Sequence, residues 1–178
     1  MADGLNFEEI YQEYKQMVYL LALKIVPISE DAEEITQDTF VKVYASLQNF
    51  KGNSSLKTWI FRIATNVALS HLQAKKRKKR FAFWVSYDEP TSGGLKREFM
   101  DFVNPEKHFE SQERLKSIYH EIDQLPPKQK IALIYYKLEQ MPIAEVAEMI
   151  GISVKGVETL VFRAKKTLGD RLTPLKEK

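Results

Sequence analysis

The sequence predicts an all-α protein with two small helical domains joined by a flexible linker, the C-terminal domain containing a helix-turn-helix. Apolar residues recur at helical intervals in both halves of the chain, and no stretch has the alternation expected of a strand. Between the halves, residues 81–105 lose this periodicity and contain proline, a Gly-Gly pair and mixed charges. We therefore expect domains at 1–80 and 109–178, with the linker at 81–108. Both domains are near the small end of what folds alone.

The first domain is expected to contain three helices. The first helix covers residues 5–26, where Asn6 followed by Glu9 resembles a capping box. Pro27 would end it, and Ser29 would cap the second helix. The third helix follows the turn residues at 49–55. The positions expected to face the core are Ile10, Tyr14, Met17, Val18, Leu21 and Ile25 in the first helix, Ala32, Ile35, Phe40, Val43, Tyr44 and Leu47 in the second, and Leu56, Trp59, Ile60, Ile63, Ala64 and Val67 in the third.

Six consecutive cations end the third helix. The chain as a whole has only a small positive excess, with 27 Lys and Arg against 24 Asp and Glu, so the clustering is the informative feature. Such cations would neutralise phosphates, and the aromatic residues on both sides could stack on unpaired bases. The alternative is a solvated helix end, with Trp59 packed in the core. The candidate nucleic-acid ligands are Arg62, Asn66, Lys75, Lys76, Arg77, Lys78, Lys79 and Arg80.

The second helix has the opposite charge along one flank. Asp31, Glu34 and Asp38 lie on this flank, with Gln37 beside them. Acids near a helix N-terminus also complement the helix dipole, but Asp38 lies too deep in the helix for that explanation. We expect a basic protein partner for this face, because carboxylates do not bind DNA phosphates.

The helix-turn-helix pattern lies at residues 143–168. Ala147 is small where a second helix must cross, Gly151 permits a turn with positive φ, and Ser153 can cap the helix that follows. The outward face of that helix would enter the major groove of DNA. The alternative is an ordinary helical hairpin with a solvated basic face. The outward residues, with the cap, are Ser153, Lys155, Glu158, Thr159, Phe162, Arg163, Lys165 and Lys166.

Catalysis, metal ions and cofactors are not expected. The chain has no cysteine, three scattered histidines and no glycine-rich phosphate loop. The first residues do not form a secretory signal, and the longest apolar stretch, at 17–28, is too short to span a membrane. We expect a cytoplasmic protein that is not an enzyme.

Two segments together resemble the extracytoplasmic-function sigma factors of bacterial RNA polymerase. The segment from "DAEEITQD" to "TWIFRIATN" is similar to their first conserved domain, and "LPPKQKIALIYYKLEQMPIAEVAEMIGISVKGVETLVFRAKKTL" is similar to their C-terminal domain. The resemblance implies a protein that binds core RNA polymerase and directs it to promoters, opening the −10 element with one domain and reading the −35 element with the other. It also implies an anti-sigma factor as a further partner.

The resemblance assigns partners to these residues. Asp31, Glu34, Gln37 and Asp38 would bind the clamp coiled coil of the largest polymerase subunit, and the C-terminal domain would meet the polymerase flap. The acidic linker resembles family linkers that follow the RNA-exit path. Where family members often carry cations in the recognition helix, this chain has Glu158 and Leu160, so its −35 preference cannot be copied from them. The positions implied for the −10 element are Phe50, Lys51, Gly52, Asn53, Ser54, Ser55 and Asn66.

Two other functions are compatible with parts of this pattern. A conventional helix-turn-helix regulator would bind duplex operator DNA without polymerase, usually as a symmetric dimer. An adaptor protein would only connect other proteins, and its cation block would be a solvated tail.

Overall fold

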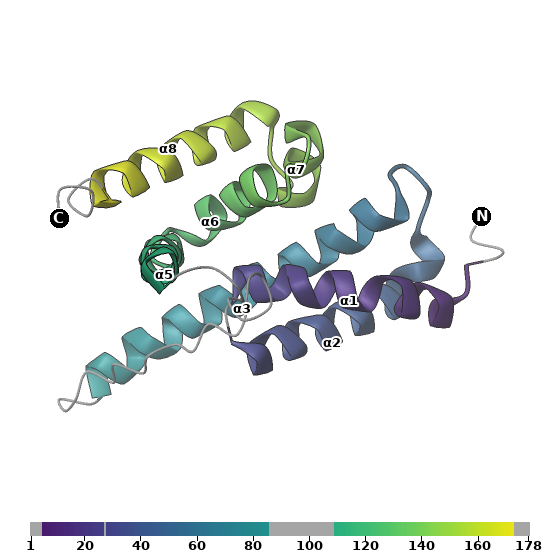
Figure 1. Ribbon diagram of the computed structural model, residues 1–178. Helices are drawn as coiled ribbons and strands as arrows, with labels where there is room; N and C mark the ends of the chain where they lie inside the picture. Colours follow the sequence, from purple (N-terminus) through teal and green to yellow (C-terminus); the bar gives the residue numbers. More distant parts are fainter. Residues whose placement is uncertain (1–4, 27, 86–108, 173–178) are drawn as a thin grey trace. The chain divides into compact units, whose positions relative to one another are not determined.

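The computed structural model describes the backbone of residues 5–26, 28–85 and 109–172, and their side chains apart from those of 79–85, 109–114 and 116. All the regular secondary structure in these residues is helical, which confirms the predicted all-α class. The chain divides into two compact units. Figure 1 shows α1, α2 and α3 in one unit and α5 to α8 in the other. Among the described helices, none combines the length and the apolar character that crossing a membrane requires.

The N-terminal unit is a packed group of three helices. They are α1 (Phe7–Ile25), α2 (Ser29–Ser46) and α3 (Leu56–Val85), and each contacts the other two. A single 3₁₀ turn, Leu47–Asn49, continues α2. One residue from each helix illustrates the core, since Val18, Ile35 and Ile60 are all essentially inaccessible to solvent. Full burial of each such side chain is worth about 1.5–3 kcal/mol, so the shared apolar faces hold the unit together.

The helix starts follow the sequence prediction in one case and differ in another. The side chain of Asn6 accepts a hydrogen bond from the Glu8 backbone N–H (2.9 Å), so Asn6 caps α1 as expected. Ser29 does not cap α2, and that prediction is wrong. The capping position needs extended backbone, and Ile28 already supplies it with φ −124° and ψ 123°. Ser29 is therefore the first helical residue, and its hydroxyl contacts the Glu30 carboxylate instead (3.3 Å).

Helix α3 is longer than the sequence suggested. It contains the whole cation block and continues to Val85, so the first five residues of the expected linker are helical. Lysine and arginine are good helix formers, and no glycine or proline interrupts this stretch, so the helix has no reason to stop at Arg80. The remaining linker residues, 86–108, and Pro27 lie outside the described residues.

In the residues that the structure describes, the C-terminal unit consists of four α-helices and a π-helical turn. The α-helices are α5 (Phe109–Asp123), α6 (Pro127–Leu133), α7 (Ile143–Ile150) and α8 (Val154–Leu172). The π-helical turn, Ile134–Leu138, continues α6 and is closed by a hydrogen bond from the Glu139 N–H to the Ile134 carbonyl (3.0 Å). Helix α8 packs against α5, α6 and α7, so its buried side holds the unit together while its other side faces outward.

A lysine is buried inside this unit. Lys130 of α6 is only 3% exposed, and its ammonium group donates a hydrogen bond to the carboxylate of Asp123 at 2.7 Å. A buried charge is costly unless it is paired, so the bond to Asp123 helps to make the burial of Lys130 possible.

Candidate nucleic-acid interface

The turn between α7 and α8 has the predicted geometry. Gly151 adopts φ 71° and ψ 42°, in the left-handed region that favours glycine. Its N–H and the N–H of Ile152 both bond the Ala147 carbonyl, at 2.9 and 3.1 Å. The Ser153 hydroxyl then accepts a hydrogen bond from the Gly156 N–H (3.2 Å), which caps α8. These local bonds fix the angle at which α8 leaves α7.

Gly156 allows Ile152 and Ser153 to pack closely against the start of α8. A Cβ atom placed there would lie 3.3 Å from both Ile152 Cδ1 and Ser153 Oγ, closer than most such contacts in proteins. Val157, Val161 and Ala164 form the buried side of α8. The packing of this side determines which residues remain on the surface.

The outward face of α8 is as the sequence predicted. Phe162 is 68% exposed, an unusual exposure for a large aromatic residue. Thr159 is also exposed, although its hydroxyl donates to the Lys155 carbonyl (2.8 Å) and would have to rotate to contact a base. Of the ion pairs among described residues, none involves the cations of this face, which are therefore available to DNA phosphates. The exposed residues are Ser153, Lys155, Glu158, Thr159, Phe162, Arg163, Lys165 and Lys166.

The acidic flank of α2 divides into two parts. Glu34, Gln37 and Asp38 are exposed, as a docking surface requires. Asp31 is different, because only 18% of its side chain is exposed and it contacts α3. The four predicted residues therefore share one helix, but only three of them face solvent.

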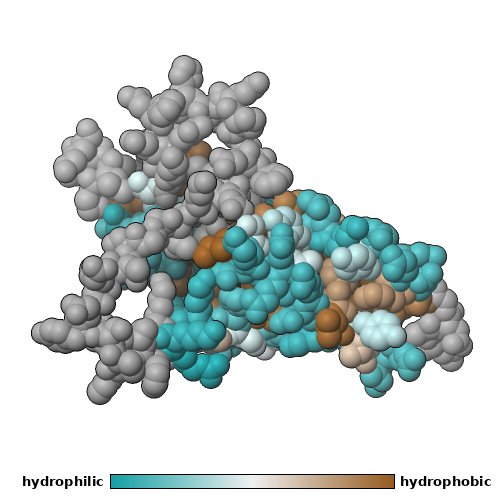
Figure 2. Space-filling model, turned by 90° about the horizontal axis from the view of Figure 1, so that it is seen from below, coloured by the Kyte–Doolittle hydropathy of each residue, from teal (hydrophilic) through white to brown (hydrophobic). Residues whose placement is uncertain are grey.

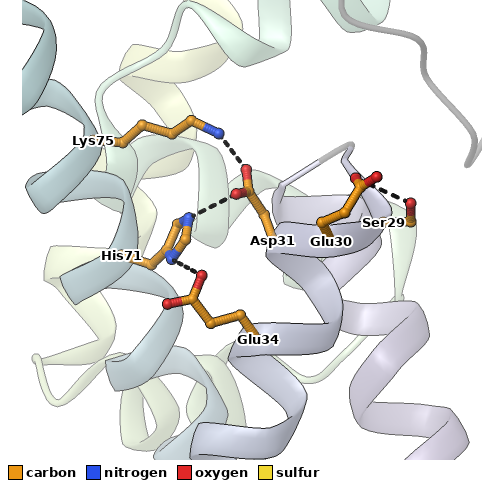
Figure 3. A network of polar contacts seen from close by, with 6 residues as sticks. All are labelled: Ser29, Glu30, Asp31, Glu34, His71 and Lys75. Carbon is orange, nitrogen blue, oxygen red and sulfur yellow. Dashed lines mark hydrogen bonds and ion pairs between the residues drawn. The ribbon is translucent and has the colours of Figure 1, made fainter.

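Asp31 belongs to a polar network between α2 and α3 (Figure 3). Its Oδ2 accepts a hydrogen bond from Lys75 of the cation block. Its Oδ1 lies 3.3 Å from His71 Nε2, while His71 Nδ1 lies 3.9 Å from Glu34 Oε2. An acid predicted for a protein partner thus pairs with a base predicted for DNA, a connection that the sequence analysis missed.

The loop before α3 holds the other predicted DNA-binding residues. Ser55 caps α3, since its hydroxyl accepts from the Thr58 N–H (3.0 Å), so its polar group is already used by the fold. Phe50 packs against Trp59, with ring centroids 5.1 Å apart, and both side chains are half-buried. Lys51 and Asn53 are exposed beside them. The loop therefore combines polar side chains with a fixed aromatic pair.

Exposed polar residues continue along α3. Arg62, Asn66, Lys76, Arg77 and Lys78 are exposed, whereas Lys75 is half-buried against Asp31. The side chains of Lys79 and Arg80, and those of the aromatic residues after them, lie outside the described residues. Most of the cation block that can be described is available to a polyanion.

Two exposed apolar side chains on α2 were not predicted. Tyr44 was assigned to the core but is 69% exposed, and its ring packs edge-on against Phe7 at the start of α1 (5.0 Å). Val41 is 67% exposed and lies three residues after Asp38, on the same side of the helix. Figure 2 shows that hydrophobic surface gathers on this unit beside the start of α1, on an otherwise largely hydrophilic face. An apolar residue outside the core-facing stripe, as Val41 is, was the signal available in the sequence.

Known families match both units. The model of sigma-70 region 2 matches residues 10–78, and that of sigma-70 region 4 matches residues 115–168. The chain is 28% identical to the RNA polymerase sigma-H factor of Pseudomonas aeruginosa over 173 residues, covering 97% of this chain and 89% of that protein. It is 29% identical to the ECF RNA polymerase sigma-E factor of Escherichia coli K12 over 175 residues, covering 97% and 90%.

Solved structures share the fold. The sigma factor RpoE of Bartonella quintana, solved with the anti-sigma factor NepR, superposes with a TM-score of 0.64 at 20% identity, covering 93% of this chain and 96% of that one. CnrH, solved with the cytosolic domain of CnrY, superposes with a TM-score of 0.61 at 20% identity, covering 96% and 91%. At this level of identity, the similarities to these two structures show a shared fold and nothing more.

Proposed function

We propose a division of labour between the two helical units, because this chain belongs to the sigma-70 family as an extracytoplasmic-function (ECF) sigma factor and directs promoter-specific transcription. The N-terminal unit docks onto core RNA polymerase and opens the −10 element. The C-terminal unit reads the −35 element as duplex DNA. The observation that carries this proposal is the placement of exposed anions on α2 and of exposed cations on α3 and α8, in a chain that matches both sigma regions.

Docking is assigned to the exposed part of the α2 flank. Glu34, Gln37 and Asp38 supply polar and negative groups, and Val41 supplies apolar area next to them. A surface with an apolar centre and charged neighbours is suited to a protein partner. The partner proposed is the clamp coiled coil of the largest polymerase subunit. Asp31 contributes less directly, because its carboxylate is already held by α3.

DNA contacts are assigned to the loop before α3, to α3 itself and to α8. The exposed residues Lys51 and Asn53 would meet the separated strand, and Arg62, Asn66 and the cation block would follow its backbone. On α8, Arg163 and Thr159 can reach base edges, and Lys155, Lys165 and Lys166 hold phosphates. Strand opening needs no covalent chemistry, since contacts with the open strand offset the few kcal/mol that unstacking costs. We therefore propose that the protein is not an enzyme and acts in the cytoplasm, with the polymerase and the chromosome.

Regulation by an anti-sigma factor is part of the proposal. The RpoE structure of Bartonella quintana contains the anti-sigma factor NepR, and its fold is shared by this chain. A protein that covers the α2 flank or α8 would block polymerase or promoter binding. The alternative of a conventional regulator acting without polymerase is not favoured, because the region 2 match covers most of the N-terminal unit.

Transcription in vitro with core polymerase tests the proposed function. Core enzyme with this protein should start transcripts at defined positions, and core enzyme alone should not. Asp38→Arg should reduce co-purification with core polymerase at least tenfold, because a positive charge would face a basic partner. Glu13→Arg is the matched control, since it makes the same charge change on an exposed residue of α1, a helix with no proposed docking role.

Two results would contradict the proposal. Specific initiation that does not depend on the added protein would remove the sigma assignment. Equal losses of polymerase binding in the Asp38 and Glu13 variants would remove the docking flank. Tight binding of duplex promoter DNA by the chain alone would support the conventional regulator.

A further inference from the structure

We propose that Asp31, Glu34 and His71 form a binding site for a divalent transition metal ion, with Zn²⁺ the best-matched ion. The residues come from two packed helices, α2 and α3, and each offers one ligand atom. These three atoms lie within 4.8 Å of one another. No metal site was expected from the sequence, because His71 is far from both acids along the chain and only the packing of α2 on α3 brings them together.

The spacing of one ligand pair already fits a zinc site. Zn–N and Zn–O bonds are about 2.0–2.2 Å long, so neighbouring ligand atoms of a tetrahedral ion lie roughly 3.3–3.5 Å apart. His71 Nε2 and Asp31 Oδ1 are 3.3 Å apart. Despite this distance they form no hydrogen bond, and Nε2 is a buried atom without any hydrogen-bond partner in the described residues. When a ring nitrogen points at a carboxylate oxygen without forming a hydrogen bond to it, the two atoms can bind one cation together.

Lys75 supports the site instead of filling it. Its ammonium group bonds Asp31 Oδ2, which leaves Oδ1 to bind an ion (Figure 3). Carboxylates that ligate metals are generally hydrogen-bonded through their other oxygen, which fixes their orientation. The Lys75 side chain is 40% exposed, so solvent weakens its repulsion of a bound cation.

Glu34 is the third proposed ligand, and its side chain is free to change its orientation. Its side chain is 65% exposed, so it can turn toward Nε2 without disturbing the core. It stands three residues after Asp31 on the same side of α2, and its Oε2 lies 3.9 Å from the other ring nitrogen of His71, Nδ1. One imidazole nitrogen with two carboxylate oxygens favours Zn²⁺ or a similar ion, because Mg²⁺ and Ca²⁺ prefer sites made of oxygen alone.

The simpler interpretation is an ion network without metal. In that case a doubly protonated imidazole would bridge the two carboxylates, with Lys75 as an additional partner of Asp31. The two interpretations differ in a measurable way, because only the metal site predicts saturable binding of one ion. If the docking role proposed above is correct, the bound ion would also offset the negative charge of Asp31 and Glu34, and would weaken polymerase binding.

Metal titration of the free chain tests the site. Full-length protein without a histidine tag is stripped with a chelator and titrated with Zn²⁺ against a chromophoric competitor. We expect one ion per chain, and we expect His71→Ala to weaken binding at least tenfold, since even residues behind the ligands change metal affinity 10–100-fold. Co²⁺ should give the visible absorption of a tetrahedral site in the wild type and lose it in His71→Ala.

Two further variants keep the result interpretable. His120→Ala removes an exposed histidine of α5 in the other unit and should bind Zn²⁺ as the wild type does. Glu34→Gln changes an exposed side chain, so it should leave the helical circular dichroism unchanged even if His71→Ala does not fold, and it should also weaken binding. The proposal is overturned if no stoichiometric binding occurs, or if Glu34→Gln and His71→Ala both bind like the wild type. The titration uses no polymerase, so its failure would leave the proposed sigma function untouched.

Discussion

Each helical unit contains a lysine–aspartate pair between two helices, and the two pairs differ in burial. Lys130 and Asp123 link α6 to α5, and their side chains are only 4% and 13% exposed. Lys75 and Asp31 link α3 to α2, and their side chains are 40% and 18% exposed. A desolvated pair cannot lose one member without leaving a buried charge, whereas water can replace an exposed partner. The first pair therefore belongs to the fold, and we expect the second to be able to exchange its partners for DNA or polymerase.

The largest effect is expected from breaking the buried pair. Asp123→Ala leaves the Lys130 ammonium group without its carboxylate, which should cost about 3–5 kcal/mol of unfolding free energy. Asp31→Ala should cost about 1 kcal/mol or less, because Lys75 remains solvated. Urea unfolding followed by far-UV circular dichroism measures both changes.

Fluorescence provides an internal control for this comparison. Trp59 packs against Phe50 in the N-terminal unit, so in a Trp84→Phe background its emission follows that unit. Asp123→Ala should shift the circular dichroism transition and leave the fluorescence transition in place. Equal destabilisation by Asp123→Ala and Asp31→Ala would show that burial does not separate the two pairs.

An effect of intermediate size is expected from the exposed cations of α8. Arg163 has no ion-pair partner among the described residues, so its guanidinium can approach DNA without first leaving a carboxylate. Arg163→Ala should weaken promoter binding by about 1–3 kcal/mol if the residue makes a bidentate contact with a base. Binding of the reconstituted holoenzyme is measured on promoters with and without base changes in the −35 element.

Arg163→Lys separates charge from base recognition. It keeps the positive charge but loses the planar fork, so it should restore phosphate binding and not base discrimination. If Arg163→Ala loses the same affinity on every −35 sequence, the residue contacts phosphate and the role of reading bases belongs elsewhere on α8.

The helix-turn-helix could be predicted from the sequence because its determinants are local. Gly151 and Ser153 act through hydrogen bonds to residues three or four positions away, and Ala147 is buried where the turn folds back. The backbone of such a motif is fixed by residue types at short spacings. The same reasoning correctly placed the exposed residues of α8, because a single helical period determines them.

The surface of the N-terminal unit could be predicted only in part. The contact of Asp31 with Lys75 joins residues 44 positions apart, and no local pattern records it. Tyr44 fits the helical period of the core, but its ring lies on the surface, 69% exposed, in an edge-on contact with Phe7. The length of α3 was underestimated because the cation block was interpreted as a helix end, although lysine and arginine favour helix.

The smallest expected effect is a difference in the salt dependence of DNA binding between variants of two adjacent lysines of α3. Each phosphate contact contributes about 0.7–0.9 to the slope of the logarithm of DNA affinity against the logarithm of salt concentration. Lys76→Ala should lower this slope by about that amount, because Lys76 is exposed and has no ion pair among the described residues. Lys75→Ala should lower the slope by less, because Asp31 already neutralises that charge.

Asp31→Asn should raise the slope, since it releases Lys75 to the phosphates. If Lys75→Ala changes the slope as much as Lys76→Ala, the contact with Asp31 does not persist on DNA, and the cation block acts as one uniform surface.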